Sequence, residues 1–438
     1  MKHPVTIGAV CLARKTFDYN AAAGIYAEIR RALESIADVR WRFIDDLVIE
    51  VDDARAAAAR LSKMEIDGLV CISGTFHLGH LVLELARTIK APLLLWGLNE
   101  LPYDGGKIRL NSVCGVNLDA SNLYKAGIRN YHAIIRDTID EDWIDAVRIG
   151  KALSTARVGI AGYRAHGFFN IDIDEPSTYR ETGALVDHFE LQDVYNHHVE
   201  KPAIDEEKEK YLKTFDVSGI SAEQLEGVAT LSARMRAFLD TGGITALAVR
   251  CWPEFASSYG IAPCAAMSLL QSEGRILACE GDIDGALSML AHRAAGAQTP
   301  FLADLSQVNM DENFALLWHC GAAPCGLWDG ICVRSLDTYF AGGKGVTADF
   351  VMKPGVVSIM RMDSVGGRYR VFQQNALGIP MEKELRGTYL KAVFEEPVKS
   401  VFDRIIYNGI AHHASVSYGE FRRPVEIFAR MKGWEIIR

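Results

Sequence analysis

The first ~125 residues alternate between strand-like and helix-like segments, and this alternation restricts the fold more than any other feature of the sequence. The strand-like segments are PVTIGAVCLA, VRWRFIDDLV, IDGLVCISGTF and APLLLWGLN, and the helix-like segments between them are NAAAGIYAEIRRALESI, DDARAAAARLSKM and LGHLVLELARTI. Such alternation predicts a parallel sheet covered by helices. Ligands of sheets of this kind bind beyond the carboxyl ends of the strands.

The same pattern begins again near Asn122. The stretch NLYKAGIRNYHAIIRDTI favours a long helix, and RVGIAGYRAHGFFN favours a strand followed by a loop. Further strand and helix signals continue to RILACE, so we predict a first α/β domain over residues 1–125 and a second over 126–295. Both are expected to be Rossmann-like, and the second carries Glu280.

After about residue 296 the pattern changes to strands separated by turns. GVTADFVMKPGVVSIMRMDSVGGRYRVFQQNA is rich in β-forming residues and has turn signals at KPG and VGG, and RRPVEIFARMKGWEII favours a closing helix and strand. We therefore predict a β-rich, antiparallel, barrel-like C-terminal domain over residues 296–438. It carries Asp304 and the pair His412–His413.

Composition excludes several classes of protein. Apolar residues make up 49% of the 438 residues, charged residues make up 24%, and the net charge is −9. This balance is that of a globular protein and disfavours binding to nucleic acid, which needs a basic surface. No apolar run has the ~18 residues of a membrane span, and the N-terminus is predicted to be a first strand, not a signal peptide. Nine cysteines without a CxxC pair predict reduced thiols in a cytoplasmic protein.

Acidic and histidine side chains stand at the ends of apolar runs in the second half of the chain. Glu280 ends the run in RILACE, Asp304 follows TPFLA, His319 lies in LLWHCG, and His412 and His413 lie in NGIAHHASVSYGEF. Oxygen and imidazole ligands without thiolate suit Mn²⁺, Mg²⁺ or Co²⁺. These side chains are therefore candidate ligands of one divalent cation.

Each of these residues also has a purely structural interpretation. Glu280 could be a helix N-terminal charge or a salt-bridge partner. Asp304 could cap a helix in SQVNMDENFALL. His319 could be a core histidine, and the histidine pair could lie on the surface. From the residues alone, these alternatives stay open.

Several blocks, in this order, resemble the L-fucose isomerase / L-arabinose isomerase family. The blocks are CISGTFHLGHLV, LWGLNELP, RVGIAGYRAHGFFN, CEGDIDGA, ADLSQVNMDENFALLWHCGAAP, VMKPGVVSIMRM and AHHASVSYGEF. The resemblance covers nearly the whole chain; it is strongest from Trp252 to Cys325 and at the histidine pair, and loose over residues 175–240. The chain is shorter than the well-known members of the family, so differences in its substrate loops are expected.

This resemblance implies a metal site and an assembly. Glu280 and Asp304 match the family's two carboxylate ligands, which also serve as the acid/base pair, and His413 matches the last ligand. The implied cation is Mn²⁺, with Mg²⁺ or Co²⁺ as alternatives. His319 matches a histidine that approaches the metal. The resemblance also implies a homo-oligomer, expected to be a hexamer.

Other side chains are candidates for sugar contacts. Trp252 and Glu254 in CWPEF are candidates to line the sugar site. Trp252 offers an aromatic face to C–H groups or is a core tryptophan, and Gly281 and Gly285 leave room for a sugar. His77 in GTFHLGH reaches a neighbouring subunit's site or is an exposed loop histidine. Adjacent residues of a regular strand point to opposite faces, so we expect one of His412 and His413 to bind the metal and the other to face away or to reach the sugar.

The predicted function is a metal-dependent aldose–ketose isomerase that acts on an open-chain sugar through an enediolate. In such a reaction a metal polarises the carbonyl and a carboxylate moves the carbon proton. The alternatives are a non-catalytic sugar-binding protein and a family member that acts on a modified sugar. A nicotinamide-dependent dehydrogenase is disfavoured because no GxGxxG follows an early strand. L-Fucose, D-arabinose, L-arabinose and a modified hexose all stay open as substrates.

Overall fold

The computed structural model describes residues 2–438, and its internal contacts divide the chain into two compact units. One unit comprises the residues up to Lys151 together with Arg423–Trp434, and the other comprises Ala152–Arg422 with Glu435–Arg438. Within the described residues, no helix combines the length and the apolar character needed to cross a membrane.

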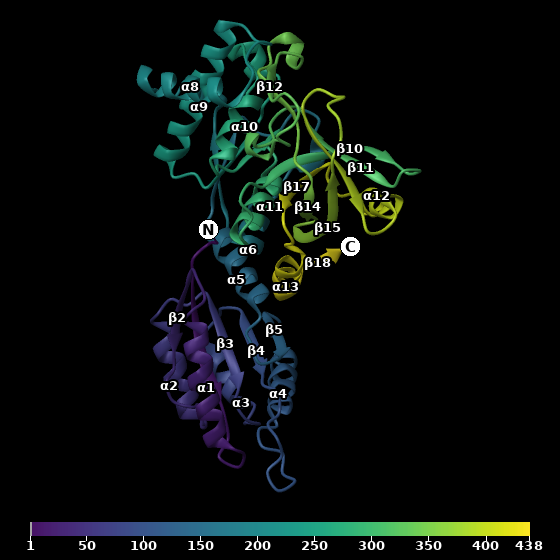
Figure 1. Cartoon of the computed structure of the whole chain (residues 1–438). Coiled ribbons are helices and arrows are strands. Elements are labelled where there is room, and N and C mark those ends of the chain that lie inside the picture. Colours follow the sequence, from purple (N-terminus) through teal and green to yellow (C-terminus); the bar gives the residue numbers. More distant parts are fainter. Residues whose placement is uncertain (1) are drawn as a thin grey trace. The chain divides into compact units, whose positions relative to one another are not determined.

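The first unit is built on a five-stranded parallel sheet of order β2-β1-β3-β4-β5 (Figure 1). Its strands are β1 (Val5–Leu12), β2 (Val39–Phe43), β3 (Gly68–Ser73), β4 (Leu93–Gly97) and β5 (Tyr131–Ile135), and its helices are α1 (Tyr19–Leu33), α2 (Val51–Ser62), α3 (His80–Thr88), α4 (Ser112–Lys125), α5 (Glu141–Ser154) and α13 (Arg422–Lys432). Side chains of α2, α3 and α4 form one core with one face of the sheet. This is the helix-covered parallel sheet predicted from the alternating segments.

One predicted helix in this unit is wrong. The stretch expected to be a single helix over residues 122–139 contains the end of α4, a turn and the whole of β5. Gly127 has a φ of +78° directly after α4, a left-handed conformation that commonly ends a helix. The first sheet therefore continues past the predicted domain boundary at residue 125.

The second unit begins with a four-stranded parallel sheet of order β7-β6-β8-β9. Its strands are β6 (Arg157–Ala161), β7 (Leu185–Phe189), β8 (Ala246–Val249) and β9 (Leu277–Cys279), and the helices around it are α6 (Glu175–Thr182), α7 (Leu191–Tyr195), α8 (Lys201–Thr214), α9 (Ala222–Gly242), α10 (Cys264–Ser272) and α11 (Ile283–Ala294). Glu280 directly follows β9, so it stands at the carboxyl end of a parallel strand, where ligands of such sheets bind.

Six antiparallel strands of the second unit close into a barrel. Their order is β16-β11-β10-β17-β14-β15, and β15 pairs again with β16 to complete the ring. The strands are β10 (Phe301–Asn309), β11 (Phe314–His319), β14 (Gly355–Val365), β15 (Arg368–Ile379), β16 (Thr388–Phe394) and β17 (His413–Tyr418), and β12 (Ser335–Asp337), β13 (Thr347–Val351) and β18 (Glu435–Ile437) extend the sheet at its margins. The predicted barrel-like character of this region is confirmed.

The four-stranded sheet and the barrel share one hydrophobic core. Buried side chains of β8, β10 and β14, among them Val249, Phe301 and Ile359, belong to the same cluster. The predicted boundary near residue 295 therefore separates two sheets that belong to the same compact unit. Strands β9, β10 and β17 contribute side chains to the same core.

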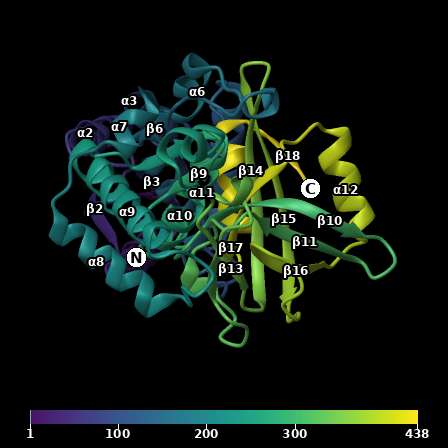
Figure 2. The ribbon, with the colours of Figure 1, turned by 90° about the horizontal axis from the view of Figure 1, so that it is seen from above.

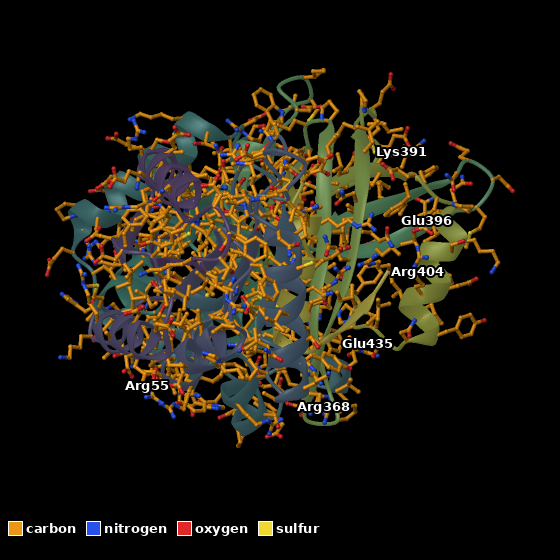
Figure 3. The ribbon with its side chains drawn as sticks, turned by 90° about the horizontal axis from the view of Figure 1, so that it is seen from below. Arg55, Arg368, Lys391, Glu396, Arg404 and Glu435 are labelled. Carbon is orange, nitrogen blue, oxygen red and sulfur yellow. The ribbon has the colours of Figure 1, made fainter. Side chains whose placement is uncertain are left out.

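A single helix, α12 (Val398–Tyr407), lies beside the barrel strand β10 (Figure 2). Its Arg404 pairs with Glu396, which precedes the helix (Figure 3). Both side chains are partly exposed, so this ion pair contributes little to stability. The packing of the apolar face of α12 on the barrel is the stronger constraint, because Val398 and Val401 are buried in the main core.

Candidate active site

Glu280 is presented to the site by a strained turn after β9. Its φ is +64°, in the left-handed region that residues other than glycine seldom adopt. The carbonyl of Glu280 accepts a hydrogen bond from the Ala165 amide at 2.8 Å, and the next amide, that of Gly281, donates to the carbonyl of Val249 at 3.1 Å. These bonds hold the strained conformation, a feature that clusters at functional sites.

The barrel places Asp304 and His413 directly opposite each other. Asp304 of β10 pairs in register with His413 of β17 on one side and with Trp318 of β11 on the other. Directly opposed residues of an antiparallel pair share one face of the sheet. Accordingly, His413 Nε2 lies 3.6 Å from Asp304 Oδ1, and it also lies 3.4 Å from Glu280 Oε2.

A buried charge network fixes the orientation of His413. Its Nδ1 lies 2.9 Å from Asp282 Oδ2, and Arg361 Nη1 donates to the same oxygen at 2.5 Å. Both Asp282 and Arg361 are fully buried. Burial opposes ionisation of Asp282, but the charge of Arg361 and the contact with His413 outweigh it and hold the pKa of the carboxyl far below its usual value. An ionised carboxylate only accepts, so His413 donates from Nδ1, and in its neutral form the lone pair of the ring lies on Nε2.

His412 is held in the opposite tautomer. The Asn170 amide nitrogen lies 3.0 Å from His412 Nδ1 and donates to it, so the ring proton is on Nε2, which lies 3.3 Å from Glu280 Oε2. His412 is therefore a hydrogen-bond donor to Glu280, whereas His413 offers an acceptor. The ring of Phe168 packs edge-on against His412, with ring centroids 5.3 Å apart.

Of the two alternatives expected for the histidine pair, the structure does not have the one in which one histidine faces away from the site. Their ring centroids are only 4.2 Å apart, and both rings approach Glu280. The reason is that β17 begins at His413, so His412 lies in an irregular bend before the strand and does not follow the strand's alternation.

The donor set of this cluster fits a divalent cation. Ligand atoms of Glu280, His412 and His413 lie within 4.8 Å of one another, and Asp304 Oδ1 stands beside His413. Asp304 Oδ1 is buried and makes no hydrogen bond with any of residues 2–438. The Nε2 of His413 thus faces two carboxylate oxygens, and with its proton on Nδ1 the ring joins them as a third ligand for a cation. Burial acts to raise the pKa of Glu280, but the hydrogen bond from His412 and the nearby histidine charges lower it, so the carboxylate form is favoured.

His319 lies next to the cluster and is buried. Its ring centroid is 5.7 Å from that of His413. Its Nδ1 accepts a hydrogen bond from the Cys320 amide at 2.9 Å, and its Nε2 is buried with no partner among the described residues. A buried polar atom without a partner is costly, which is consistent with a polar ligand at this position.

A wide pocket of about 760 Å³ opens in front of the carboxylates. Glu280, Asp304 and His319 line it together with the aromatic side chains of Trp252, Trp318 and Phe340, and its remaining lining residues are Pro253, Ala256, Ser257, Cys320, Ala341, Gly342 and Lys344. Trp252 lies in this pocket as predicted from the sequence, and its Nε1 donates to Glu280 Oε1 at 3.4 Å. The volume lies within the range of about 300–1,000 Å³ typical of small-molecule sites.

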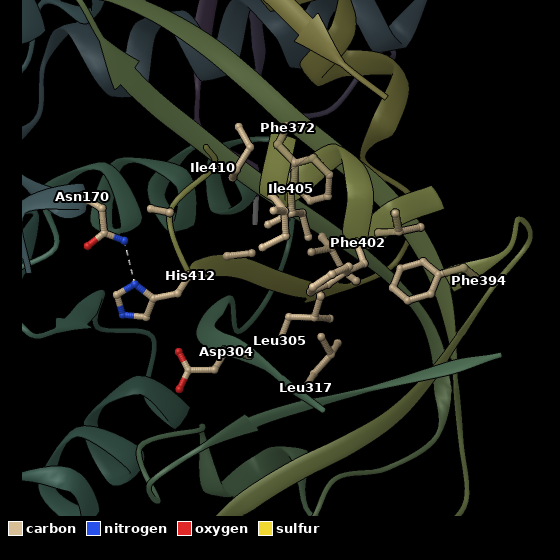
Figure 4. Close-up of a pocket in the computed structure, with 16 residues that line it drawn as sticks. Asn170, Asp304, Leu305, Leu317, Phe372, Phe394, Phe402, Ile405, Ile410 and His412 are labelled. Atoms are coloured by element: carbon tan, nitrogen blue, oxygen red, sulfur yellow. Dashed lines mark hydrogen bonds between the residues drawn. The ribbon is translucent and has the colours of Figure 1, made fainter. Parts of the chain in front are cut away.

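Asp304 also borders a second, largely apolar cavity of about 240 Å³. Figure 4 shows the polar side chains of Asn170, His412 and Asp304 on one side of this cavity and the aliphatic and aromatic side chains of the barrel and α12 on the other. Asp304 thus lies between a pocket wide enough for a sugar and the apolar interior of the barrel.

Two further sequence-based expectations differ from the structure. The segment SQVNMDENFALL is the hairpin between β10 and β11, so Asp304 lies within a strand and caps no helix. Gly281 and Gly285 make room for protein, not for a ligand: a Cβ on Gly281 would lie 2.5 Å from the Tyr163 carbonyl, and one on Gly285 would lie 2.6 Å from Asp282 Oδ2.

His77 lies in the first unit and is neither exposed nor part of the cluster. It is fully buried, with Nδ1 3.0 Å from the Thr75 carbonyl and Nε2 3.0 Å from Asp119 Oδ2. Both ring nitrogens are therefore occupied within its own chain, and its position gives no support to the predicted contact with a sugar in a neighbouring subunit.

Sequence reasoning assigned no role to Asp282, Arg361, Asn170 or Phe168. Asp282 was visible as an acidic residue two positions after Glu280, but its partner Arg361 comes from β14, far along the chain. Asn170 and Phe168 lie in RVGIAGYRAHGFFN, a block that resembled the family without indicating which of its residues reach the site.

Comparison with known proteins agrees with the family resemblance of the sequence. Residues 8–160 match the family described as fucose/sulfoquinovose isomerase, N-terminal domain. The chain is 26% identical to the sulfoquinovose isomerase of Priestia aryabhattai over 446 residues and 26% identical to that of Alkalicoccus urumqiensis over 444 residues, and each alignment covers 98% of both chains. The names of these relatives support the class predicted from the sequence, an aldose–ketose isomerase. The chain is thus similar to the fucose isomerase-like family, through the family model over its first part and through these full-length relatives.

The solved structures that match this chain are too dissimilar to indicate its fold or function. A solute binding protein of an ABC transporter from Agrobacterium vitis, bound with α-D-tagatopyranose, is 12% identical to this chain. The match covers 58% of this chain and 79% of that protein, with a TM-score of 0.17, which is too low to indicate a common fold.

Proposed function

We propose that this protein is a divalent-metal-dependent isomerase that interconverts an aldose and a ketose in their open-chain forms. The observation that carries the proposal is the convergence of Glu280, Asp304 and His413 Nε2, three acceptors that face one another at the end of a sugar-sized pocket. The names of the relatives, sulfoquinovose isomerases, favour a sulfonated hexose as the substrate. The predicted hexamer and the cytoplasmic location stay predictions.

The residues that would hold the cation are Glu280, Asp304 and His413, and Mn²⁺ is the proposed ion, with Mg²⁺ or Co²⁺ as alternatives. When bound, such a cation polarises the substrate carbonyl and stabilises negative charge on oxygen. His413 is chosen over His412 because Asp282 leaves its Nε2 free to accept, whereas Asn170 leaves a proton on Nε2 of His412.

The two carboxylates are the groups able to move the carbon proton. Isomerisation requires that a proton leaves carbon 2 of the aldose and returns to carbon 1 through an enediolate, while a second proton moves between the two oxygens. Asp304 lines the pocket, and its carboxylate is therefore placed to accept a proton from a substrate there. Glu280 is held by His412 and Trp252, and the lowered pKa of its carboxyl keeps it ionised.

The proposed function is tested by offering the metal-depleted protein a panel of aldoses with and without Mn²⁺. The panel contains sulfoquinovose, glucose, L-fucose, D-arabinose and L-arabinose, and ketose formation is measured. We expect ketose only when Mn²⁺ is present. Sugar binding without ketose formation under both conditions would favour a non-catalytic sugar-binding protein.

The tautomers predict different roles for the two adjacent histidines. We expect His413→Ala to weaken Mn²⁺ binding by more than about 100-fold, because it removes a ligand and not merely a neighbour of one. We expect His412→Ala to keep Mn²⁺ affinity within about 10-fold of wild type and to lower kcat or raise KM, since it removes a donor to Glu280. Calorimetric Mn²⁺ titration of both variants checks this, and the reversed order of affinities would make His412 the ligand.

A further inference from the structure

The pocket that contains Glu280 and Asp304 has one cationic lining residue, Lys344. Lys344 is exposed, and its ammonium group makes no hydrogen bond or ion pair within the part of the chain that the structure describes, residues 2–438. The other lining side chains are acidic, aromatic, small or neutral. The charged groups that line the pocket are thus the carboxylates of Glu280 and Asp304 and the free ammonium group of Lys344.

Neighbouring arginines are already neutralised. Arg250 lies just after β8 and pairs with Glu254 at 2.9 Å, and Arg164 pairs with Asp172 at 3.2 Å. Neither arginine lines the pocket. A negatively charged group that enters the pocket therefore finds Lys344 as its available cation.

The loop that carries Lys344 holds its backbone in place and leaves the side chain free. In the sequence AGGKG, residues 341–345, both Gly342 and Gly343 have positive φ, at +66° and +83°. The Gly345 amide donates to the Phe340 carbonyl at 2.9 Å, and the Lys344 carbonyl accepts from the Ala262 amide at 3.2 Å. The loop is thereby tied to its own base and to the segment before α10.

The charged side chains of the pocket favour one orientation of a substrate that has a carbonyl at one end and an anionic group at the other. Glu280 and Asp304 repel an anionic group, and the reacting carbonyl must lie beside them if they move the carbon proton. An anionic group at the far end of the sugar is drawn instead to Lys344. The same arrangement gives a neutral hexose no comparable contact.

We propose that Lys344 binds an anionic group on the substrate carbon farthest from the carbonyl and thereby makes the enzyme selective for anionic over neutral hexoses. This inference rests on the proposed isomerase function. Sulfonate and phosphate share the required chemistry, and the names of the relatives favour sulfonate. Lys344 is a specificity-determining residue in this account and takes no part in proton transfer.

The test compares kcat/KM for sulfoquinovose, glucose 6-phosphate and glucose in four proteins: wild type, Lys344→Met, Lys344→Arg and Lys353→Met. Lys344→Met removes the charge and keeps the length of the side chain, and Lys344→Arg keeps the charge. Lys353→Met is the matched control, because it changes the net charge equally, while Lys353 stacks on Tyr418 with its Nζ 5.2 Å from the ring centroid and does not line the pocket.

We expect Lys344→Met to lower kcat/KM for the preferred anionic sugar by roughly 10- to 100-fold, mainly through KM, and to leave kcat/KM for glucose within about 3-fold. Lys344→Arg and Lys353→Met should resemble wild type. A preference for glucose 6-phosphate over sulfoquinovose would support the anion site and assign it to phosphate. Equal losses on anionic and neutral sugars, or no loss on either, would overturn the proposal.

The two proposals fail in different ways. A wild-type protein that isomerises glucose but neither anionic sugar would overturn the role of Lys344 and leave the isomerase function intact. A wild-type protein that forms no ketose from any sugar in the presence of Mn²⁺ would contradict the isomerase function and, with it, the role of Lys344.

Discussion

We expect Glu280→Gln to lower kcat/KM by at least about a thousand-fold, the largest effect of any single substitution considered for this site. The change keeps the size of the side chain and removes its charge. It therefore weakens the proposed cation site and removes a carboxylate from the face of the pocket, while the strained turn after β9 and its backbone hydrogen bonds are kept. Steady-state rates together with metal content after dialysis measure both consequences.

Glu254→Gln is the matched control for this substitution. Glu254 lies two residues after Trp252 and pairs with Arg250, but it does not line the pocket. Its substitution should leave the rate within a few-fold of wild type. A Glu280→Gln protein that keeps more than a tenth of wild-type kcat/KM with full metal content would show that Glu280 is neither a ligand nor an acid/base group.

The second large effect is on stability, and we expect it from Arg361→Met. Arg361 and Asp282 are both fully buried, and Asp282 also contacts His413. Removing one partner of a buried ion pair leaves an uncompensated charge, which destabilises a protein by about 3–5 kcal/mol. The expected result is a marked fall in the urea midpoint of the unit that contains the barrel, with weaker Mn²⁺ binding because His413 loses its fixed orientation.

Two further variants show whether the loss of stability in Arg361→Met comes from the buried ion pair or from replacing an arginine as such. Arg404→Met removes a partly exposed partner of Glu396 and should cost less than about 1 kcal/mol. The double variant Arg361→Met with Asp282→Asn should recover part of the stability lost by the single variant, because no buried charge is then left alone. If Arg361→Met is no less stable than Arg404→Met, the buried network does not hold the site together.

The pattern of apolar residues predicted which segments are helices and strands. It predicted less well where these segments end and which strands pair. The alternating segments identified both parallel sheets, because each strand–helix unit is a local signal. The stretch over residues 122–139 misled, since the apolar spacing of α4 runs on into β5 and only the turn at Gly127 marks the change. Closure of the barrel depends on the pairing of β15 with β16, a long-range contact that the pattern of apolar residues does not specify.

The same difference applies to the site: some of its residues are recognisable from their neighbours in sequence, and others depend on partners that are remote in sequence. Glu280 and Asp304 were candidates because each is a charged group at the end of an apolar run. His413 was singled out by the family resemblance, and the structure brings all three residues together. Asp282 looked like one more acidic residue, because its role depends on Arg361 and His413, which are remote in sequence. The sequence analysis assigned no role to Lys344, because only the folded chain shows which lysine lines the pocket.

The central claim is that a cation held by this cluster is needed for isomerisation, and stoichiometric titration tests it most directly. The protein is freed of metal with a chelator, Mn²⁺ is added back in fractions of an equivalent, and ketose formation is measured after each addition. We predict no turnover without metal and a rate that rises linearly until one Mn²⁺ is bound per chain. A full rate in the continued presence of the chelator would contradict the account.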